Sequence, residues 1–373
     1  MASVESHTGC LSGVMETAEG DAYKFKNGDI LYGKLRPYLN KVWLATFDGI
    51  CSTEFHVLRT KNNTKSELLY NILLSDVVLK QTIHMMTGNT HPRLSDDDVK
   101  KLIIPIPKNE ASYHTLTFAK SSYALKQHKA VSVLQNFKDS ISNIFDFSLN
   151  QGNNSRLCFA IRFKDLDGVI DAKRYASVST KTAKFKISDI CEILDEKVNV
   201  SRFDKKIIDW IRIDDLPNQH LDIVEVRTQP ANKVEGTFFE VQEGDILVAR
   251  LGPTILNQKI VMVRSVERTT IASAEFLVLR CKEGYNPEAV MAVLKTAYYR
   301  DLMYSHARGS TPSRYRLNRE DMLKLPFPDI REHQDKIAND ANNVREQVKA
   351  MRIQAEQEWQ AAKKQFEKEL LGE

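Results

Sequence analysis

The chain has 373 residues, a formal net charge of +4 and 42% hydrophobic residues. This length predicts two or three domains, and the mild basicity permits nucleic-acid binding without requiring it. The five cysteines include no Cys-x-x-Cys pair, which argues against a disulfide framework or a structural zinc site. Because no stretch is typical of a signal peptide or a membrane-spanning helix, we expect a cytoplasmic protein without membrane contact.

An internal repeat begins at the first Gly-Asp turn of the chain. Four blocks recur in the same order: Gly28–Leu31 as Gly244–Leu247, Ser52–Arg59 as Ser273–Arg280, Gly88–Leu94 as Gly309–Tyr315, and Pro105–Pro107 as Pro326–Pro328. The offset is 216 residues at the first block (28 to 244) and 221 at the others (52 to 273), so a single five-residue insertion accounts for the difference. Similar strands met twice by chance do not preserve spacing, so the repeat indicates a duplicated module.

Each copy has the same predicted elements. Aliphatic and β-branched residues after the Gly-Asp turn, at 246–248 and 260–263, predict strands, and the alternating Glu-Phe-x-Val-Leu-Arg block predicts another. One helix is predicted in each copy, over Leu68–Met86 and Pro287–Ser305, and Pro287 suits a first helical position. A Gly-Asn/Ser-Thr loop and a Pro-x-Pro strand follow. The pattern indicates an α+β fold of mixed strands and helices.

A long helix is predicted after each copy. The last segment has apolar residues at steps of three and four: Ile337, Ala341, Val344, Val348, Met351, Ala355, Trp359, Ala362 and Phe366. This spacing is typical of a coiled-coil seam. The segment after the first copy has a looser apolar face: Leu116, Tyr123, Val131, Leu134, Ile141 and Phe145. We expect the two helices to pack on each other and to hold the modules at a fixed separation.

These elements define four predicted parts. They are a first module at 1–107, a helix at 108–150, a second module at 151–328 and a helix at 329–373. The second copy has a lead-in from about Leu157 to Gly244, whereas only 27 residues precede Gly28. The first module is therefore short at its N-terminal side in this sequence, because the gene was trimmed, because the sequence is a fragment, or because the first module is reduced.

Motifs of catalysis are missing from the sequence. We find no phosphate-binding loop, no Asn/Asp-Pro-Pro-aromatic motif of an amino-methyltransferase and no dinucleotide-type glycine loop. His84 and His91 could form a metal pair, but a polar surface pair is favoured. The repeated acids Glu54 and Glu275 lack the Asp and Glu-x-Lys context of a nuclease, which favours a structural role, binding backbone or an arginine, over catalysis. A duplicated module without catalytic motifs is typical of a binding protein.

Basic and amide side chains in predicted loops suit DNA. Arginine can form paired hydrogen bonds with phosphate or guanine, and small residues let the backbone approach phosphates. The candidates of the first module are Lys34, Arg36, Tyr38, Asn40, Lys41, Asn89, Thr90 and Arg93. Those of the second are Arg250, Asn257, Gln258, Lys259, Arg308, Ser310, Thr311, Arg314 and Arg316. The alternative is that they are solvated turn residues, and their matching placement in both copies favours the DNA-binding interpretation.

The residues resemble a known family. Gly28–Lys41 is similar to a signature of the target-recognition domains of type I restriction-modification specificity subunits. Further similar motifs are Ser52–Phe55, Asp171–Tyr175, Trp210–Leu216, Gly309–Thr311, Leu325–Pro328 and Glu332–Ile337. The resemblance covers nearly the whole chain, and the order and duplication of the motifs make it specific.

The resemblance implies a fold and partners. Members of this family have two target-recognition domains joined by two antiparallel spacer helices, and each domain reads one half of a split double-stranded DNA sequence. DNA adenine methyltransferase subunits bind the specificity subunit, and a restriction (motor-nuclease) subunit can join them. S-adenosylmethionine, ATP and Mg²⁺ are then expected only in partner subunits, with no cofactor and no catalytic residue in this chain. Linking two weak readers raises affinity only where their spacing fits the target.

The sequence departs from the family in two places, which keeps alternatives open. The first module is short, and the segment at Lys108–Ser112 lacks the Glu-x-Gln start found at Glu332. One alternative is a degenerate, scaffold-type subunit that binds methyltransferase without full DNA reading. Another, disfavoured by the missing motifs, is a stand-alone DNA-modifying enzyme.

Overall fold

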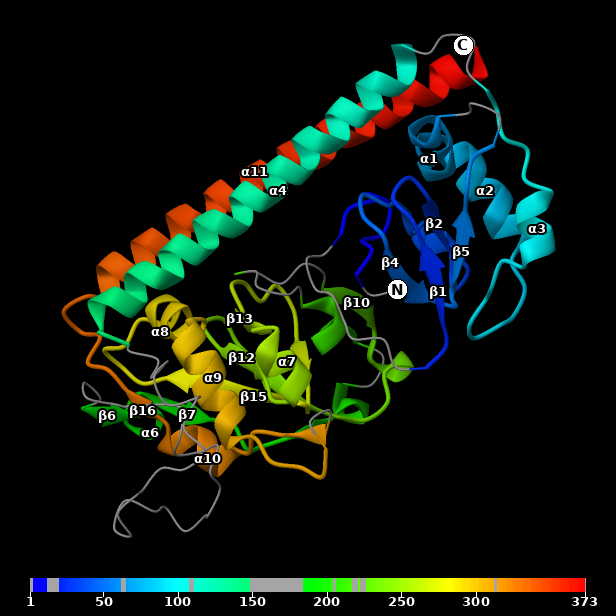
Figure 1. Ribbon diagram of the computed structural model, residues 1–373. Coiled ribbons are helices and arrows are strands. Elements are labelled where there is room, and N and C mark those ends of the chain that lie inside the picture. The colour runs from blue at the N-terminus through cyan, green and yellow to red at the C-terminus, as the bar shows by residue number, and fades with distance from the viewer. Residues whose placement is uncertain are drawn as a thin grey trace. The chain divides into compact units, whose positions relative to one another are not determined.

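A computed structural model describes residues 3–11, 20–61, 65–106, 111–147, 184–203, 206–216, 221, 226–311 and 314–372. Within 111–147, side chains are described from residue 116 onward. The motif at Asp171–Tyr175 and the predicted boundaries at 107 and 150 lie outside the described residues. Two compact units are present: unit 1 comprises 1–130 and 349–373, and unit 2 comprises 131–348. The positions of the two units relative to each other are not determined, so each is described by itself (Figure 1).

Unit 1 contains two small antiparallel sheets and a few helices. One sheet pairs β1 (Ala22–Phe25) with β4 (Gly49–Ser52), and the other has the order β3 (Val42–Leu44), β2 (Ile30–Gly33), β5 (Phe55–Leu58). The other elements are η1 (Pro37–Leu39), α1 (Ser66–Leu74), α2 (Asp76–Met85) and α3 (Asp96–Lys100). The first half of helix α4 (Ala111–Ile144) and the second half of helix α11 (Gln334–Leu371) complete the unit.

Unit 2 contains the same elements and a further set before them. A four-stranded sheet has the order β13 (Ile260–Met262), β12 (Ile246–Ala249), β15 (Phe276–Cys281), β7 (Cys191–Ile193). A five-stranded sheet has the order β10 (Arg227–Pro230), β9 (Ile207–Ile211), β14 (Thr270–Ser273), β11 (Thr237–Val241), β8 (Val198–Asn199). A two-stranded sheet pairs β16 (Pro326–Phe327) with β6 (Phe185–Lys186). The remaining elements are α6 (Ile187–Ile190), η3 (Val200–Phe203), η4 (Ile213–Asp215), η5 (Ala231–Lys233), α7 (Gly252–Leu256), α8 (Pro287–Leu294), α9 (Ala297–His306) and α10 (Arg319–Lys324).

Strand register confirms the duplication. Ile30 faces Leu58 between β2 and β5, and Ile246 faces Leu279 between β12 and β15, as the offsets of 216 and 221 require. β1 and β4 correspond in the same way to β11 and β14. The chain is therefore an α+β protein built from two copies of one module. Among the described residues of unit 1, no strand corresponds to β6 through β10.

The Gly-Asp turn positions a buried acid in each module. Gly28 and Gly244 have φ values of +86° and +88°, which favour glycine over other residues. Asp29 follows, is 2% exposed, and accepts hydrogen bonds from Nε and Nη2 of Arg59, both at 2.6 Å. Asp245 accepts the same pair from Arg280, both at 2.8 Å. Because a buried carboxylate needs such partners, the arginine that ends each Glu-Phe-x-Val-Leu-Arg block is part of the fold.

The single helix predicted in each copy is wrong, because two helices are present. In the first copy the helix is interrupted at Ser75, which has an extended conformation between α1 and α2. In the second copy it is interrupted at Lys295 and Thr296, between α8 and α9. The hydroxyls of Ser75 and Thr296 donate to the carbonyls of Ile72 and Val293. A hydroxyl that bonds to the preceding turn competes with helix continuation, while the apolar spacing continues across the break.

The two long predicted helices are confirmed as α4 and α11. Within unit 1, Tyr123 packs against Trp359 and Lys126 pairs with Glu358, so the half-helices lie antiparallel (Figure 1). In unit 2, Phe145 of the residues following α4 contacts His333 just before α11. The predicted seam is largely buried, but Val131 is 45% exposed, so its placement on the packed face was wrong.

The half-helices that cover the modules share one burial pattern. In unit 2, Leu134, Lys138, Ile141 and Phe145 are buried at steps of four, three and four, and Phe137 is buried beside them. In unit 1, Trp359, Lys363, Phe366 and Leu370 are buried at the same steps. The second half of α4 in unit 2 and the second half of α11 in unit 1 therefore bury corresponding positions.

Candidate DNA interface

The loop that joins the second module helix to the short helix after it holds most candidate arginines. In unit 1, Arg93 forms bridges with Thr87 and Leu35, and in unit 2, Arg316 forms bridges with Arg308 and Leu251. Arg93 therefore corresponds to Arg316. The sequence alignment had paired Arg93 with Arg314, and the second loop instead carries two more residues than the first.

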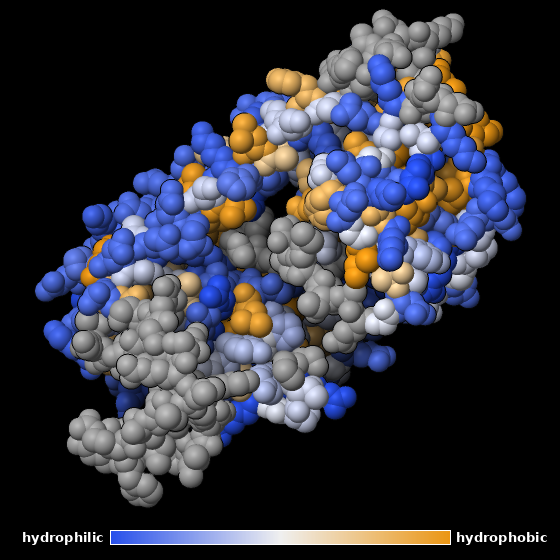
Figure 2. Space-filling model, in the orientation of Figure 1, coloured by the Kyte–Doolittle hydropathy of each residue, from blue (hydrophilic) through white to orange (hydrophobic). Residues whose placement is uncertain are grey.

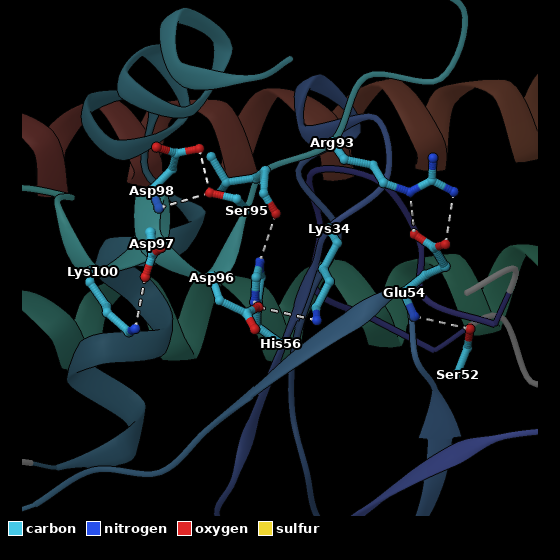
Figure 3. A network of polar contacts seen from close by, with 11 residues as sticks. Lys34, Ser52, Glu54, His56, Arg93, Ser95, Asp96, Asp97, Asp98 and Lys100 are labelled. Atoms are coloured by element: carbon cyan, nitrogen blue, oxygen red, sulfur yellow. Dashed lines mark hydrogen bonds and ion pairs between the residues drawn. The ribbon is translucent and has the colours of Figure 1, made fainter. Parts of the chain in front are cut away.

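A glutamate–arginine pair fixes this loop in both modules. Arg93 donates to both oxygens of Glu54, at 3.1 and 2.9 Å (Figure 3). Arg316 donates to both oxygens of Glu275, each at 3.2 Å, and Arg250 approaches the same carboxylate at 3.4 Å. The hydrogen bonds from Arg93 lower the pKa of Glu54. The structural role predicted for both acids is confirmed: each binds arginine.

Lys34 belongs to a second network in unit 1. Its Nζ lies 3.2 Å from Asp96, and the same carboxylate lies 2.8 Å from Nδ1 of His56 (Figure 3). His56 is buried, and its Nε2 lies 3.1 Å from the carbonyl of Leu94. Burial, with the nearby charge of Lys34, lowers the pKa of His56. Asp96 is 70% exposed at its side chain, whereas the side chain of Lys34 is only 18% exposed.

Two candidates lie in the interior instead of on the surface. Asn40 and Gln258 are 1% and 5% exposed, and both have left-handed φ values, 43° and 49°. Their side-chain amides donate to the carbonyls of Leu74 and Lys295, at 2.9 and 2.7 Å, where α1 and α8 end. These carbonyls need partners because a helix end leaves them unpaired. The prediction that Asn40 and Gln258 contact DNA is therefore corrected to a structural role in both modules.

Some of the remaining candidates have hydrogen-bond partners within the protein, and others are exposed. Arg308 donates to the buried Asp321 at 3.1 Å, and Lys259 donates to the carbonyl of Ile213 at 2.9 Å. Burial lowers the pKa of Lys259 and of Lys41. The exposed candidates are Arg36, Tyr38, Asn89, Thr90, Asn257, Ser310, Thr311 and Arg314. Within the described part of the chain, the guanidinium groups of Arg36 and Arg314 have no hydrogen bond or ion pair.

The backbone is unusual at the two segments that carry Arg36 and Arg314. Arg36 has a left-handed φ of 50°, which is costly for a residue with a Cβ and is typically retained where function needs it. Its N–H donates to the carbonyl of Pro92, so it lies beside the Arg93 loop. At Gly309 an added Cβ would lie 2.5 Å from the backbone oxygen of Arg314, so glycine is required for the close turn of that loop.

Two other predictions concern metals and membranes. Among the residues that the structure describes, no group of three or more His, Cys, Asp or Glu could hold a metal ion, and His84 and His91 belong to none. No described helix is long and apolar enough to cross a membrane.

Comparison with known proteins identifies the class of module. Residues 12–145 match the family described as the type I restriction modification DNA specificity domain. This match covers about a third of the chain and supports the resemblance seen in the sequence. The strands and helices of unit 2 repeat those of the matched segment.

Individual relatives agree. The chain is similar to the Type I restriction enzyme EcoDI specificity subunit of Escherichia coli, with 31% identity over 108 residues. This match covers 28% of the chain and 24% of the relative, so it spans about a quarter of that protein's length.

Solved structures also align along most of the chain. One is a structure described as the structural basis of complex assembly and conformational transition of the type I R-M system. It has a TM-score of 0.44 and 16% identity, and the match covers 99% of this chain and 89% of that chain. The HsdS subunit from Thermoanaerobacter tengcongensis has a TM-score of 0.36 at 15% identity, with 99% and 88% covered. The S subunit from M. genitalium has a TM-score of 0.41 at 14% identity, with 94% and 84% covered.

Proposed function

We propose that this chain is the DNA-sequence-specificity subunit of a type I restriction-modification complex. In this role it binds a bipartite double-stranded DNA target and docks DNA adenine methyltransferase subunits, with a restriction (motor-nuclease) subunit where the host has one. It acts without catalytic residues or a cofactor of its own, in the cytoplasm, while S-adenosylmethionine, ATP and Mg²⁺ are used by its partners. The observation that carries the proposal is the duplicated loop, held by a Glu–Arg pair in each module, beside Arg36 and Arg314, which have no ion partner among the described residues.

Arginines in and beside the loop have two different roles. Arg93 and Arg316 donate hydrogen bonds to Glu54 and Glu275, and these bonds orient the loop. Arg36 in unit 1 and Arg314 in unit 2 keep all five guanidinium donors for phosphate or guanine. Neighbouring hydroxyl and amide side chains, such as Ser310 and Asn89, suit phosphate oxygens and base edges.

A second candidate function is a scaffold that binds methyltransferase while reading only one half-site. The observation in its favour is that unit 1 has no described counterpart of β6 through β10. Comparing the methylomes of the host with and without the gene separates the two functions. Loss of methylation at one split motif supports the specificity subunit, loss at a single short half-site supports the scaffold with one reader, and no change contradicts both.

Arg314→Ala is expected to weaken DNA binding by the whole chain about tenfold, since one arginine contact to a base or phosphate contributes about 1–3 kcal/mol. The fold should be unaffected because Arg314 is exposed. Fluorescence anisotropy with the methylated motif measures this at fixed salt. Arg202→Ala, at an exposed arginine of η3, is the matched control and should bind like the wild type. Unchanged affinity of Arg314→Ala would remove this loop from the DNA-contacting surface.

Deleting one heptad of α11 around Met351, with the facing heptad of α4, is expected to change the preferred gap between half-sites. A heptad keeps the phase of the packed face and removes about 10 Å of helix, close to three base pairs of DNA. Methylation of a library with all gap lengths measures the preference. Inserting one heptad at the same place should shift it the opposite way, and an unaltered gap in both variants contradicts a spacing role for the helices.

A further inference from the structure

Two cysteines of unit 2 lie side by side in the four-stranded sheet. Cys191 begins β7 and Cys281 ends β15, and the two residues are directly opposite each other in the antiparallel pairing. Their Sγ atoms are 3.6 Å apart, although 90 residues separate them in the sequence. Sequence patterns for disulfides and zinc sites depend on short spacings along the chain, so they could not reveal this pair.

The strand register suits a covalent bond between these two thiols. The N–H of Lys282 donates to the carbonyl of Ile190 at 2.8 Å, one position along the ladder from the cysteines. Bonded and non-bonded pairs alternate between antiparallel strands, so Cys191 and Cys281 form a non-hydrogen-bonded pair, whose Cα atoms are about 4.5 Å apart. Disulfides span Cα separations of about 4.4–6.8 Å. Rotation of the side chains can therefore join the sulfur atoms without moving the strands.

The two thiols differ in their access to solvent. Cys191 is 1% exposed, whereas Cys281 is partly exposed at the end of its strand, next to the exposed Lys282. The hydrogen bond to Cys281, with burial, raises the pKa of Cys191, against a smaller opposing effect of Lys282. Because the thiolate is the reactive form of cysteine and reagents must reach it, Cys281 is the sulfur that an oxidant from solution meets first.

The other cysteines provide internal controls. Thr60 occupies the position of Cys281 in the first module, at the offset of 221 residues, so the pair is not repeated there. Cys51 of β4 lies opposite Tyr23 of β1, and it is partly buried like Cys281. Cys158 lies outside the described residues. A link between two identified peptides therefore distinguishes the pair in unit 2 from any other pairing.

We propose that Cys191 and Cys281 form a disulfide when the chain meets a small-molecule disulfide such as oxidised glutathione. The thiolate of Cys281 attacks one sulfur of the oxidant, whose S–S bond breaks, and one glutathione leaves as a thiolate. Cys191 then loses its proton and attacks the Cys281 sulfur, which releases the second glutathione. The two cysteines lose two electrons and two protons, and the oxidant takes up both as it becomes two glutathione thiols.

The disulfide would fix an edge strand that holds the neighbouring helix α10. In the described sheet β7 lies at the edge, beside β15. Arg319, at the start of α10, donates to the carbonyl of Ile193 in β7 and to the carboxylate of Asp195, each at 3.2 Å. Because the disulfide ties β7 to β15, it opposes the local opening in which β7 leaves the sheet and releases Arg319. Oxidation is therefore expected to slow hydrogen exchange in β7 and α10.

The test exposes the full chain, in native buffer, to oxidised glutathione and identifies linked peptides by mass spectrometry. We expect one link, between the peptides that contain Cys191 and Cys281, with the loss of two hydrogen atoms, and its reversal by dithiothreitol. Hydrogen exchange of the β7 amides should be about tenfold slower in the oxidised chain.

Three variants test the order of the two steps. Cys191→Ala should accumulate a glutathione adduct at Cys281, because no second thiol displaces the glutathione. Cys281→Ser should leave Cys191 unmodified, since Cys191 is buried. Cys51→Ser is the matched control and should form the link at the wild-type rate.

Other outcomes overturn the proposal. One is a glutathione adduct at Cys281 of the wild type that Cys191 does not displace. Another is a set of links from Cys191 or Cys281 to other cysteines under native conditions, as random pairing produces. An adduct on Cys191 in Cys281→Ser would contradict the proposed order, and unchanged hydrogen exchange in the oxidised chain would contradict the fixing of β7. No DNA or partner subunit is present in these measurements, so they stand or fall apart from the proposed function.

Discussion

Trp359→Ala is expected to lower the free energy of unfolding of unit 1 by about 3–5 kcal/mol, the range for removing a large buried aromatic side chain. Trp359 is 1% exposed and lies in a cluster with Leu116, Phe366 and Leu370. Its indole Nε1 has no hydrogen-bond partner among the described residues, so the loss comes from apolar packing. Hydrogen exchange read by mass spectrometry measures it, as reduced protection of α1 and β2.

The control and the contrary result use the repeat. Ile353→Ala, on the same helix at 48% exposure, should change stability by less than about 1 kcal/mol. Leu134→Ala, at the corresponding position of α4, should instead destabilise unit 2 and reduce protection of β12. If Trp359→Ala leaves α1 as protected as in the wild type, the C-terminal half of α11 is not what stabilises the first module.

Features that depend on spacing were predictable from the sequence. The offsets of 216 and 221 residues carry directly into strand register, because a two-residue period leaves no freedom to slip where one face is buried. Apolar steps of three and four likewise identified α11, including the buried Ala355 and Trp359.

Features that depend on tertiary contacts were not predictable. Asn40 and Gln258 stand among basic residues in the sequence, and only the position of a helix end, far along the chain, turns them inward. The correspondence of Arg93 with Arg316 was hidden because the two-residue insertion lies inside the loop, where Arg314 offers a false match. The repeated Asp29 and Asp245 were visible as part of a motif, but their partners, 30 and 35 residues later, could be recognised only by geometry.

A buried lysine that the sequence did not single out gives the second large effect. As pH rises from about 8 to 10.5, the wild type should gain up to about 3 kcal/mol of stability relative to Lys138→Met, taking about 1.4 kcal/mol for each unit of pKa difference. Lys138 is 4% exposed and donates to Oε1 of Gln258 at 2.6 Å. Burial, with the nearby charge of Arg300, lowers its pKa from 10.5 to about 8, against a smaller opposing effect of Asp139.

The direction follows from proton binding. Between pH 8 and 10.5 the unfolded chain still holds the proton on Lys138 while the folded chain has released it, so raising the pH favours the folded state. Below pH 8 both states are protonated, and the difference between wild type and variant should be constant. Urea unfolding of unit 2 at a series of pH values measures this difference. Gln135→Met, exposed on the same helix and without a titrating group, should differ from the wild type by the same amount at every pH. A pH-independent difference for Lys138→Met would mean that water reaches this lysine, and the contact of α4 with Gln258 would then be looser than a buried hydrogen bond requires.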